Sequence, residues 1–187
     1  MSRLAVQLVL VSIITASCSA AADQPAPRSA AIQLRNPSTH VTEGELVVTA
    51  EPDVVYATLV DYAHWTNVFT YLNTVNITSQ RGDRAEIVTI SKKGNKSTLR
   101  FNNDRTKRLV RFDQLGGRAD AKAQIAISPG KAAGTTVVQV RLDAQVSGPA
   151  GWFVSDSQVR AKREKKIAKD LGQLEAYFRK PATASTK

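Results

Sequence analysis

The residues best suited to acid–base chemistry lie within four positions of one another. Asp61, Tyr62 and His64 could supply a carboxylate, a phenol and an imidazole to one reacting centre, provided that the fold turns all three into the same cavity. The only other histidine, His40, lies at the edge of a proline-containing segment. A structural interpretation is favoured over the catalytic one: Asp61 and Tyr62 hold the end of a helix, and His64 faces solvent.

Other catalytic patterns are missing from the sequence. It contains no Gly-x-Ser-x-Gly elbow and no phosphate-binding loop, and its histidines, single cysteine and acidic residues do not have the spacing of metal ligands. We therefore expect no metal site and no cofactor. The pattern favours a binding protein over an enzyme, although it does not decide between them.

The strongest charge signal is near the C-terminus. Residues 158–180 carry eight lysines and arginines against three acidic residues, in a chain of net charge +10. Such a surface attracts nucleic acid or anionic lipid. No nucleic-acid module is present, so we expect an anionic membrane surface and no nucleic acid as a partner. The expected membrane contacts are the basic side chains and the two aromatics that precede them: Trp152, Phe153, Lys162, Arg163, Lys165 and Lys166. The two aromatics could instead be buried as a cap on the core.

The N-terminus has the pattern of an export signal. An early positive charge, Arg3, precedes an apolar run that is too short to span a bilayer, and small residues follow it. Residues 1–22 therefore predict a signal peptide. Cys18 follows "TAS" in a stretch similar to a lipoprotein signal covering residues 1–17, so lipidation at Cys18 is the alternative to simple removal. Both predict an exported protein of the periplasm or envelope, in the second case lipid-anchored, whose mature domain forms no internal disulfide.

The remaining chain suits a single domain. Its 187 residues, 42% of them hydrophobic, are enough to bury one core. Residues 23–39 contain three prolines and predict a flexible tether, and residues 181–187 predict a short tail. The domain is thus expected at 40–180.

Within the domain, hydrophobic periodicity predicts mixed α and β structure. A strand at 40–50 precedes helical spacing at 51–69, and a long helix is expected at 152–178. Between them, apolar and polar residues alternate in segments separated by turn formers, which is typical of an antiparallel sheet with one wet face. These expected strands are 74–80, 84–92, 97–104, 108–115, 120–128 and 135–146.

The stretch "VVTAEPDVVYATLVDYAHWTNVF" resembles the START-like superfamily (SRPBCC), particularly its coenzyme Q-binding and polyketide cyclase/dehydrase branch. The matching positions are Pro52, Val55, Tyr56, Leu59, Asp61, Tyr62 and Trp65. The resemblance covers residues 41–178 and implies an α+β helix-grip fold, in which an antiparallel curved sheet wraps around a long C-terminal helix. It further implies an apolar cavity between them. The lining would be the apolar side chains of the sheet and helices: Tyr56, Leu59, Trp65, Phe69, Leu99, Phe101, Phe112, Ile125, Ile127, Val138, Val140, Leu142, Ile167 and Leu171. Plain core packing would use the same residues.

Together these observations predict binding or transfer of a hydrophobic small molecule, such as a lipid, quinone or terpenoid-like compound, at the cell envelope. One alternative is a cyclase- or dehydrase-like enzyme on the same fold that uses Asp61, Tyr62 and His64. Another is an envelope interaction protein whose core is filled and which binds no ligand.

Overall fold

The computed structural model describes residues 31–115, 119–146 and 155–179, which form one antiparallel sheet and a set of helices. The helical elements are α1 (Pro52–Val60), the single 3-10 turn η1 (Tyr62–His64), α2 (Trp65–Val68) and α3 (Asp156–Arg179). The strands are β1 (Gln33–Arg35), β2 (Val41–Val48), β3 (Leu72–Arg81), β4 (Arg84–Ser91), β5 (Lys96–Asn102), β6 (Leu109–Leu115), β7 (Ala119–Pro129) and β8 (Thr136–Val146).

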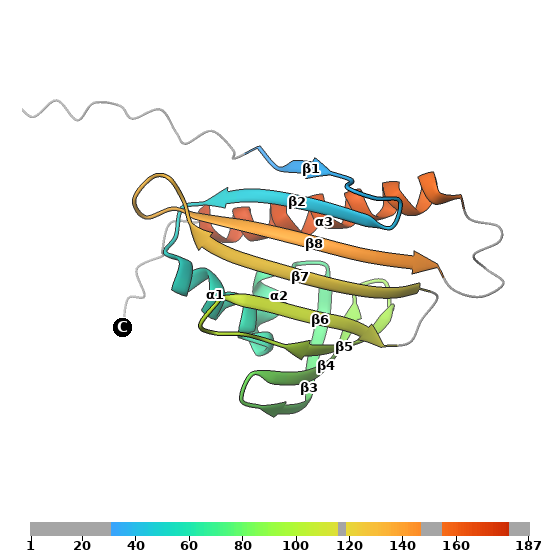
Figure 1. Ribbon diagram of the computed structural model, residues 1–187. Coiled ribbons are helices and arrows are strands. Elements are labelled where there is room, and N and C mark those ends of the chain that lie inside the picture. The colour runs from blue at the N-terminus through green and yellow to red at the C-terminus, as the bar shows by residue number, and fades with distance from the viewer. Residues whose placement is uncertain (1–30, 116–118, 147–154, 180–187) are drawn as a thin grey trace, which may run out of the picture.

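The sheet is a continuous antiparallel layer in the order β1-β2-β8-β7-β6-β5-β4-β3. Hairpins join the successive strands from β3 to β8, and β2 pairs with β8, so the first long strand and the last strand of the domain are neighbours close to the β1 edge. All helices lie on one side of it, behind the sheet in the view of Figure 1. We call this side the inner face and the opposite, solvated side the outer face.

Alternation along each strand determines which residues reach the inner face. Leu46, Val138 and Ile127 are paired neighbours on β2, β8 and β7, and all three are buried. Their sequence neighbours on the outer face include Gln139 and Glu45. The expected fold class, an α+β helix-grip with a long C-terminal helix against a curved antiparallel sheet, is confirmed.

A glycine permits the close contact between α3 and the sheet. A Cβ atom at Gly44, on β2, would lie 2.4 Å from Ile167 Cγ2 and 3.0 Å from Leu171 Cδ1. Real Cβ atoms do not approach other atoms so closely, so a larger residue would push α3 outward. Ile167, Leu171 and Leu174 form the buried stripe of α3, which packs chiefly over β2 and β8.

Two segments differ from the sequence expectation. Within residues 23–39, expected to be a flexible tether, Gln33–Arg35 form β1 and pair with β2, because an edge strand of three residues needs no apolar periodicity of its own. The helical spacing at 51–69 is broken at Asp61, whose backbone leaves the helical region (φ −84°, ψ 72°), and this break separates α1 from η1 and α2. In the expected helix at 152–178, residues 152–154 lie outside the described residues.

Candidate functional site

The fourteen residues expected to line a cavity all lie in or against one hydrophobic cluster on the inner face. Ten of them are buried members of that cluster: Tyr56, Leu59, Trp65, Phe69, Leu99, Phe101, Ile127, Val138, Ile167 and Leu171. The other four are only partly buried, and we call them the apolar band: Phe112, Ile125, Val140 and Leu142. Whether a ligand enters between these side chains stays a prediction.

Burial changes along the strands from one end of the sheet to the other. Where α1 crosses β7 and β8, the paired inner-face residues Ile127 and Val138 are almost fully buried. Toward the other end of the same strands, the apolar band is partly accessible to solvent. The strand register places Ile125 and Val140 in one row with the buried Val110, and Phe112 and Leu142 in the next row with the buried Ala123. On β8 the inner face is therefore closed at Val138, where α1 covers it, and more open at Val140 and Leu142.

Tyr62, Trp65 and Phe101 form an aromatic cluster that packs against the inner face at β5. The Tyr62 ring lies 4.5 Å from the Phe101 ring and 5.3 Å from the Trp65 ring, measured between centroids. Trp65 is held in place because its Nε1 donates a hydrogen bond of 3.0 Å to the Leu59 carbonyl oxygen. The Tyr62–Trp65 contact is edge-to-face and the Tyr62–Phe101 contact is tilted, and aromatic contacts of both kinds stabilise a packed cluster.

Tyr62 carries a buried hydroxyl group. Its side chain is 2% exposed, and its oxygen accepts a hydrogen bond of 2.8 Å from Asn103 Nδ2. Burial raises the pKa of Tyr62 to about 12, although the hydrogen bond from Asn103 opposes the shift. The other amide atom, Asn103 Oδ1, is buried without a partner within the described part of the chain. This site offers a neutral phenol and a carbonyl-type acceptor at neutral pH.

The structure does not bring the three acid–base candidates together. His64 Nδ1 lies 2.7 Å from Asp61 Oδ2, but both side chains are more than half exposed on the surface. Asp61 and His64 line a surface pocket of about 410 Å³ together with Val54 and Tyr177. Tyr62 instead points into the core, so Asp61 and His64 cannot act with it on one reacting centre in this arrangement.

Arg163 is the main correction among the expected membrane contacts. It is only 3% exposed, and its guanidinium donates to Thr42 Oγ1 (3.1 Å) and to the carbonyl oxygens of Ala144 (3.1 Å) and Thr39 (2.6 Å). It therefore cannot reach a membrane and instead fastens α3 to β2 and β8. The reason lies in helical spacing, because Arg163 precedes Ile167 by four residues and so belongs to the buried stripe.

The other flank of α3 is fastened by lysines and an aromatic ring. Lys166 Nζ donates to the Tyr71 hydroxyl (2.9 Å) and pairs with Asp170, and Lys169 Nζ lies 4.1 Å from the centroid of the Tyr71 ring. Desolvation works to lower the pKa of Lys166, but Asp170 and Tyr71 outweigh it, so the pKa is raised and the ammonium stays charged. Gln173 Nε2 donates to Thr70 Oγ1 at 2.7 Å on the same flank.

The remaining expected membrane contacts fall into two groups. Lys162, Lys165 and Lys166 are exposed on α3, as the charge pattern predicted. Trp152 and Phe153, and Cys18 at the expected lipidation site, lie outside the described residues.

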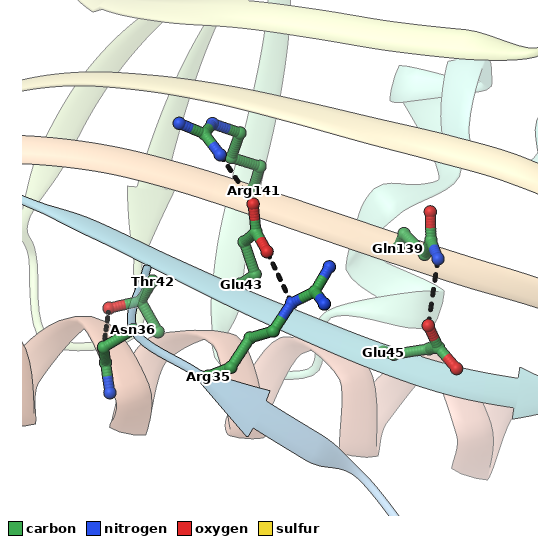
Figure 2. Close-up of polar contacts among 7 residues, drawn as sticks. All are labelled: Arg35, Asn36, Thr42, Glu43, Glu45, Gln139 and Arg141. Carbon is green, nitrogen blue, oxygen red and sulfur yellow. Dashed lines mark hydrogen bonds and ion pairs between the residues drawn. The ribbon is translucent and has the colours of Figure 1, made fainter. Parts of the chain in front are cut away.

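The outer face carries a polar cluster that fastens β1 to the sheet. Figure 2 shows Glu43 between two arginines: its Oε2 accepts from Arg35 Nε and its Oε1 from Arg141, both at 2.6 Å. Desolvation works to raise the pKa of Glu43, but the hydrogen bonds from Arg141 and Arg35 outweigh it and hold the pKa below its ordinary value. A hollow of about 220 Å³ borders these residues. Because Glu43 is satisfied by the protein itself, the cluster acts first as a brace for β1.

A second contact ties the residue after β1 to α3. Asn36 Oδ1 accepts from Thr42 Oγ1 at 2.8 Å, as Figure 2 shows, and Asn36 Nδ2 donates to Glu164 Oε1 at 2.6 Å. Sequence reasoning missed Asn36, Thr42, Asn103 and Tyr71. For Thr42 the inward alternation of β2 was an available signal, whereas the other three depend on contacts between distant segments.

Neither a metal centre nor a membrane-spanning helix is found in the parts of the chain that the structure describes. Among those residues, no three histidine, cysteine or acidic side chains gather in a way that could hold a metal ion. In the same ranges, no helix is both long and apolar enough to cross a bilayer.

Comparison with known proteins gives a family and a set of similar folds. The family model for "Polyketide cyclase / dehydrase and lipid transport" matches residues 39–179. Comparison with curated protein sequences gives no significant match.

Three solved structures illustrate the likeness. The Zhui aromatase/cyclase from Streptomyces sp. R1128 has a TM-score of 0.65 at 18% identity, covering 83% of this chain and 100% of that one. A START superfamily protein from Mycobacterium smegmatis has a TM-score of 0.64 at 14% identity, covering 74% and 97%. The di-domain ARO/CYC BexL of the BE-7585A biosynthetic pathway has a TM-score of 0.63 at 19% identity; the match covers 73% of this chain and 45% of that chain. At these identities the likeness shows the fold alone.

Proposed function

Because the chain belongs to the polyketide cyclase/dehydrase and lipid transport family, we propose that it binds or transfers a hydrophobic small molecule, such as a lipid, quinone or terpenoid-like compound, at a cell envelope. The observation that carries this proposal is the apolar band. Four large apolar side chains on the inner face remain partly accessible at one end of an otherwise buried cluster. A hydrophobic ligand that covered them would gain about 25 cal/mol for each Å² of apolar surface removed from water.

The position of α3 supports an entrance at this end. The helix packs over β2 and β8, whereas the apolar band continues onto β6 and β7 beyond it. At the other end α1 covers the same strands, whereas Tyr62, Trp65 and Phe101 lie to the side of the band, because Phe101 on β5 pairs directly with Phe112. A ligand would therefore enter past Leu142 and Phe112 and extend toward the aromatic cluster, where the neutral Tyr62 hydroxyl could meet a polar atom.

Charge at the same end supports delivery from an anionic membrane. Arg163 donates to the Ala144 carbonyl, and this contact places the N-terminal half of α3 beside the end of β8 that holds the apolar band. In Figure 1 both lie at the same end of the domain. Arg160, Lys162 and Lys165 are exposed there, and each basic residue near an anionic surface contributes about 1 kcal/mol. Contact through these residues would bring the entrance close to the lipid.

The N-terminal segment fits this placement. The brace at Glu43 holds Arg35 against the sheet. If the chain were lipidated at Cys18, only the residues between Cys18 and β1 would connect the domain to the membrane. Fifteen residues span at most about 50 Å when fully extended, which is enough for the domain to touch the membrane and to leave it.

The direct test is native mass spectrometry of the full chain purified from its own host, followed by organic extraction. We expect a bound apolar compound that is released by the solvent. A matched pair of variants tests the site: Leu142→Gln in the apolar band and Val47→Gln, which is 42% exposed elsewhere on the sheet. Leu142→Gln is expected to weaken binding of a dansyl-labelled fatty acid roughly tenfold, because the polar amide would be buried beside the ligand. Equal affinities for the two variants would contradict the proposed entrance.

The membrane step has its own matched pair. Lys162→Gln with Lys165→Gln removes two charges from α3, and Arg84→Gln with Arg111→Gln removes two exposed charges from the sheet. The first pair is expected to lose about 2 kcal/mol of binding to phosphatidylserine-containing vesicles, roughly thirtyfold in affinity, and the second far less. The same loss in both pairs would show that net charge alone governs the binding.

A further inference from the structure

The strand β3 leaves an unusually long open edge at the end of the sheet. It has ten residues and is the last strand in the sheet order, so only its β4 side has a strand partner among the described residues. From Leu72 to Gln80 it contains no charged residue and no proline, in a chain of net charge +10. The opposite edge is different, since β1 has only three residues and carries Arg35.

Open edges of this kind normally carry protection. Natural proteins shorten them or add charges, prolines or bulges, because unpaired backbone groups invite another strand. β3 has register irregularities between Leu72 and Thr74 and between Ile77 and Ser79, but the pairing of Thr74–Ile77 with β4 is regular. Within this stretch Ile77 is 41% exposed, although Val75 on the same face packs against the core. An exposed isoleucine on a regular, uncharged edge is a surface suited to a partner strand.

The sequence of this edge matches itself when it is reversed. Around Asn76, the residues Thr74-Val75-Asn76-Ile77-Thr78 have the same chemical types in both directions. We propose that β3 pairs antiparallel with β3 of a second copy of this chain, about a two-fold axis at Asn76. Val75 then lies opposite the partner's Ile77, Thr74 opposite the partner's Thr78, and Asn76 opposite the partner's Asn76. A two-fold interface requires exactly such self-complementarity.

This pairing accounts for features that the ligand site does not. Aromatic or β-branched pairs across strands stabilise a sheet, and here the two valine–isoleucine pairs would cover the exposed Ile77 of each copy. The lack of charge on β3 keeps like charges from facing each other at the axis of a basic dimer. α3 lies over β2 and β8 near the opposite edge, so it would not obstruct the approach of the second copy.

The test is a pair of opposite charge substitutions on the two-fold axis. Asn76→Lys or Asn76→Glu alone would place like charges directly opposite each other, so each protein is expected to dimerise at least roughly tenfold more weakly than the unaltered chain. An equimolar mixture is expected to form the heterodimer, because lysine then faces glutamate. The matched control is the same pair of changes at Gln33, on the β1 edge, which should leave the dimer unaffected. Native mass spectrometry over a concentration series distinguishes all three species.

A covalent test is independent of charge. Directly opposite residues in an antiparallel pair have Cα atoms roughly 4.5–5.5 Å apart, within the range that a disulfide spans. Asn76→Cys in the full chain, with the single native cysteine Cys18 replaced by serine, is expected to form a cross-linked dimer on mild oxidation, and Gln33→Cys is not. A chain that stays monomeric throughout the series, a dimer that survives Asn76→Lys unchanged, or equal cross-linking at both positions would overturn the proposal. Circular dichroism of each variant verifies that it is folded.

Discussion

The buried hydroxyl of Tyr62 makes the domain sensitive to alkaline pH. Burial raises the pKa of this phenol from its ordinary value of 10.0 to about 12, so the folded state favours the neutral form. Well below pH 10, for example at about pH 8, the phenol is neutral in both the folded and the unfolded chain and has no effect on the pH dependence. As pH rises from 10 toward 12, the unfolded chain ionises first, and the free energy of unfolding falls.

The magnitude follows from the shift in the Tyr62 pKa. At about pH 11, the unfolded phenol is roughly nine-tenths ionised and the folded one roughly one-tenth, so linkage gives a loss of about 1.4 kcal/mol. The full shift of about two pKa units corresponds to about 2.7 kcal/mol. Tyr62→Phe removes this contribution. At neutral pH the same variant loses the hydrogen bond from Asn103, a cost of about 1 kcal/mol.

Urea unfolding of both proteins at about pH 8 and about pH 11 measures the difference. Between these two pH values the free energy of unfolding is expected to fall by about 1.4 kcal/mol more in the unaltered chain than in Tyr62→Phe. The other tyrosines and the lysines are present in both proteins, so their contributions cancel in this difference. An identical alkaline loss in the two proteins would mean that the Tyr62 hydroxyl reaches solvent and would refute the closed aromatic cluster.

Two further predictions concern the contacts that hold α3 and β1. Gly44→Ala is expected to lower the free energy of unfolding by about 1–3 kcal/mol, because the added Cβ would lie 2.4 Å from Ile167 Cγ2. The shift in the urea midpoint measures this loss of stability. An unchanged midpoint would show that α3 moves freely. Glu43 has a lowered pKa, so its stabilising effect is present above its ordinary pKa of 4.5 and is lost as pH falls below that value. Glu43→Gln is therefore expected to lower the free energy of unfolding by about 1 kcal/mol near neutral pH and to reduce the further loss of stability below its ordinary pKa of 4.5, both measured by urea unfolding. If the variant and the unaltered chain lost equal stability in that acid range, the result would count against the brace.

The sheet and its inner face could be predicted because strand alternation is a local signal. Val138, Val140 and Leu142 alternate with Gln139 and Arg141, and the structure places the first set inward as expected. The seven strands from β2 to β8 coincide with the expected segments to within two residues at each end. β1 could not be predicted, because three residues carry no period and the strand is held by backbone pairing with β2, where Arg35 lies opposite Glu43.

The site was less accessible from the sequence because it depends on where side chains point. Asp61, Tyr62 and His64 are close in the chain, but the backbone break at Asp61 sends Tyr62 into the core and leaves the other two on the surface. Arg163 was grouped with the exposed lysines by its charge, whereas its helical position decides its burial. A guanidinium can be buried there only because three oxygens from Thr39, Thr42 and Ala144 accept its hydrogen bonds.

The way in which α3 is fastened bears on how a ligand could enter. Apolar packing against Gly44 holds the middle of the helix, whereas polar contacts hold its flanks, through Arg163 on one side and through Lys166 with Tyr71 on the other. The contacts of Arg163 lie at the end where the apolar band is accessible, and breaking them would leave a buried guanidinium without partners, which costs several kcal/mol. A membrane that attracts the neighbouring lysines of α3 would therefore act on a part of the helix that Arg163 holds firmly to the sheet. In the proposed carrier, a ligand would thus enter past Leu142 and Phe112 beside α3 and would not need to displace the helix.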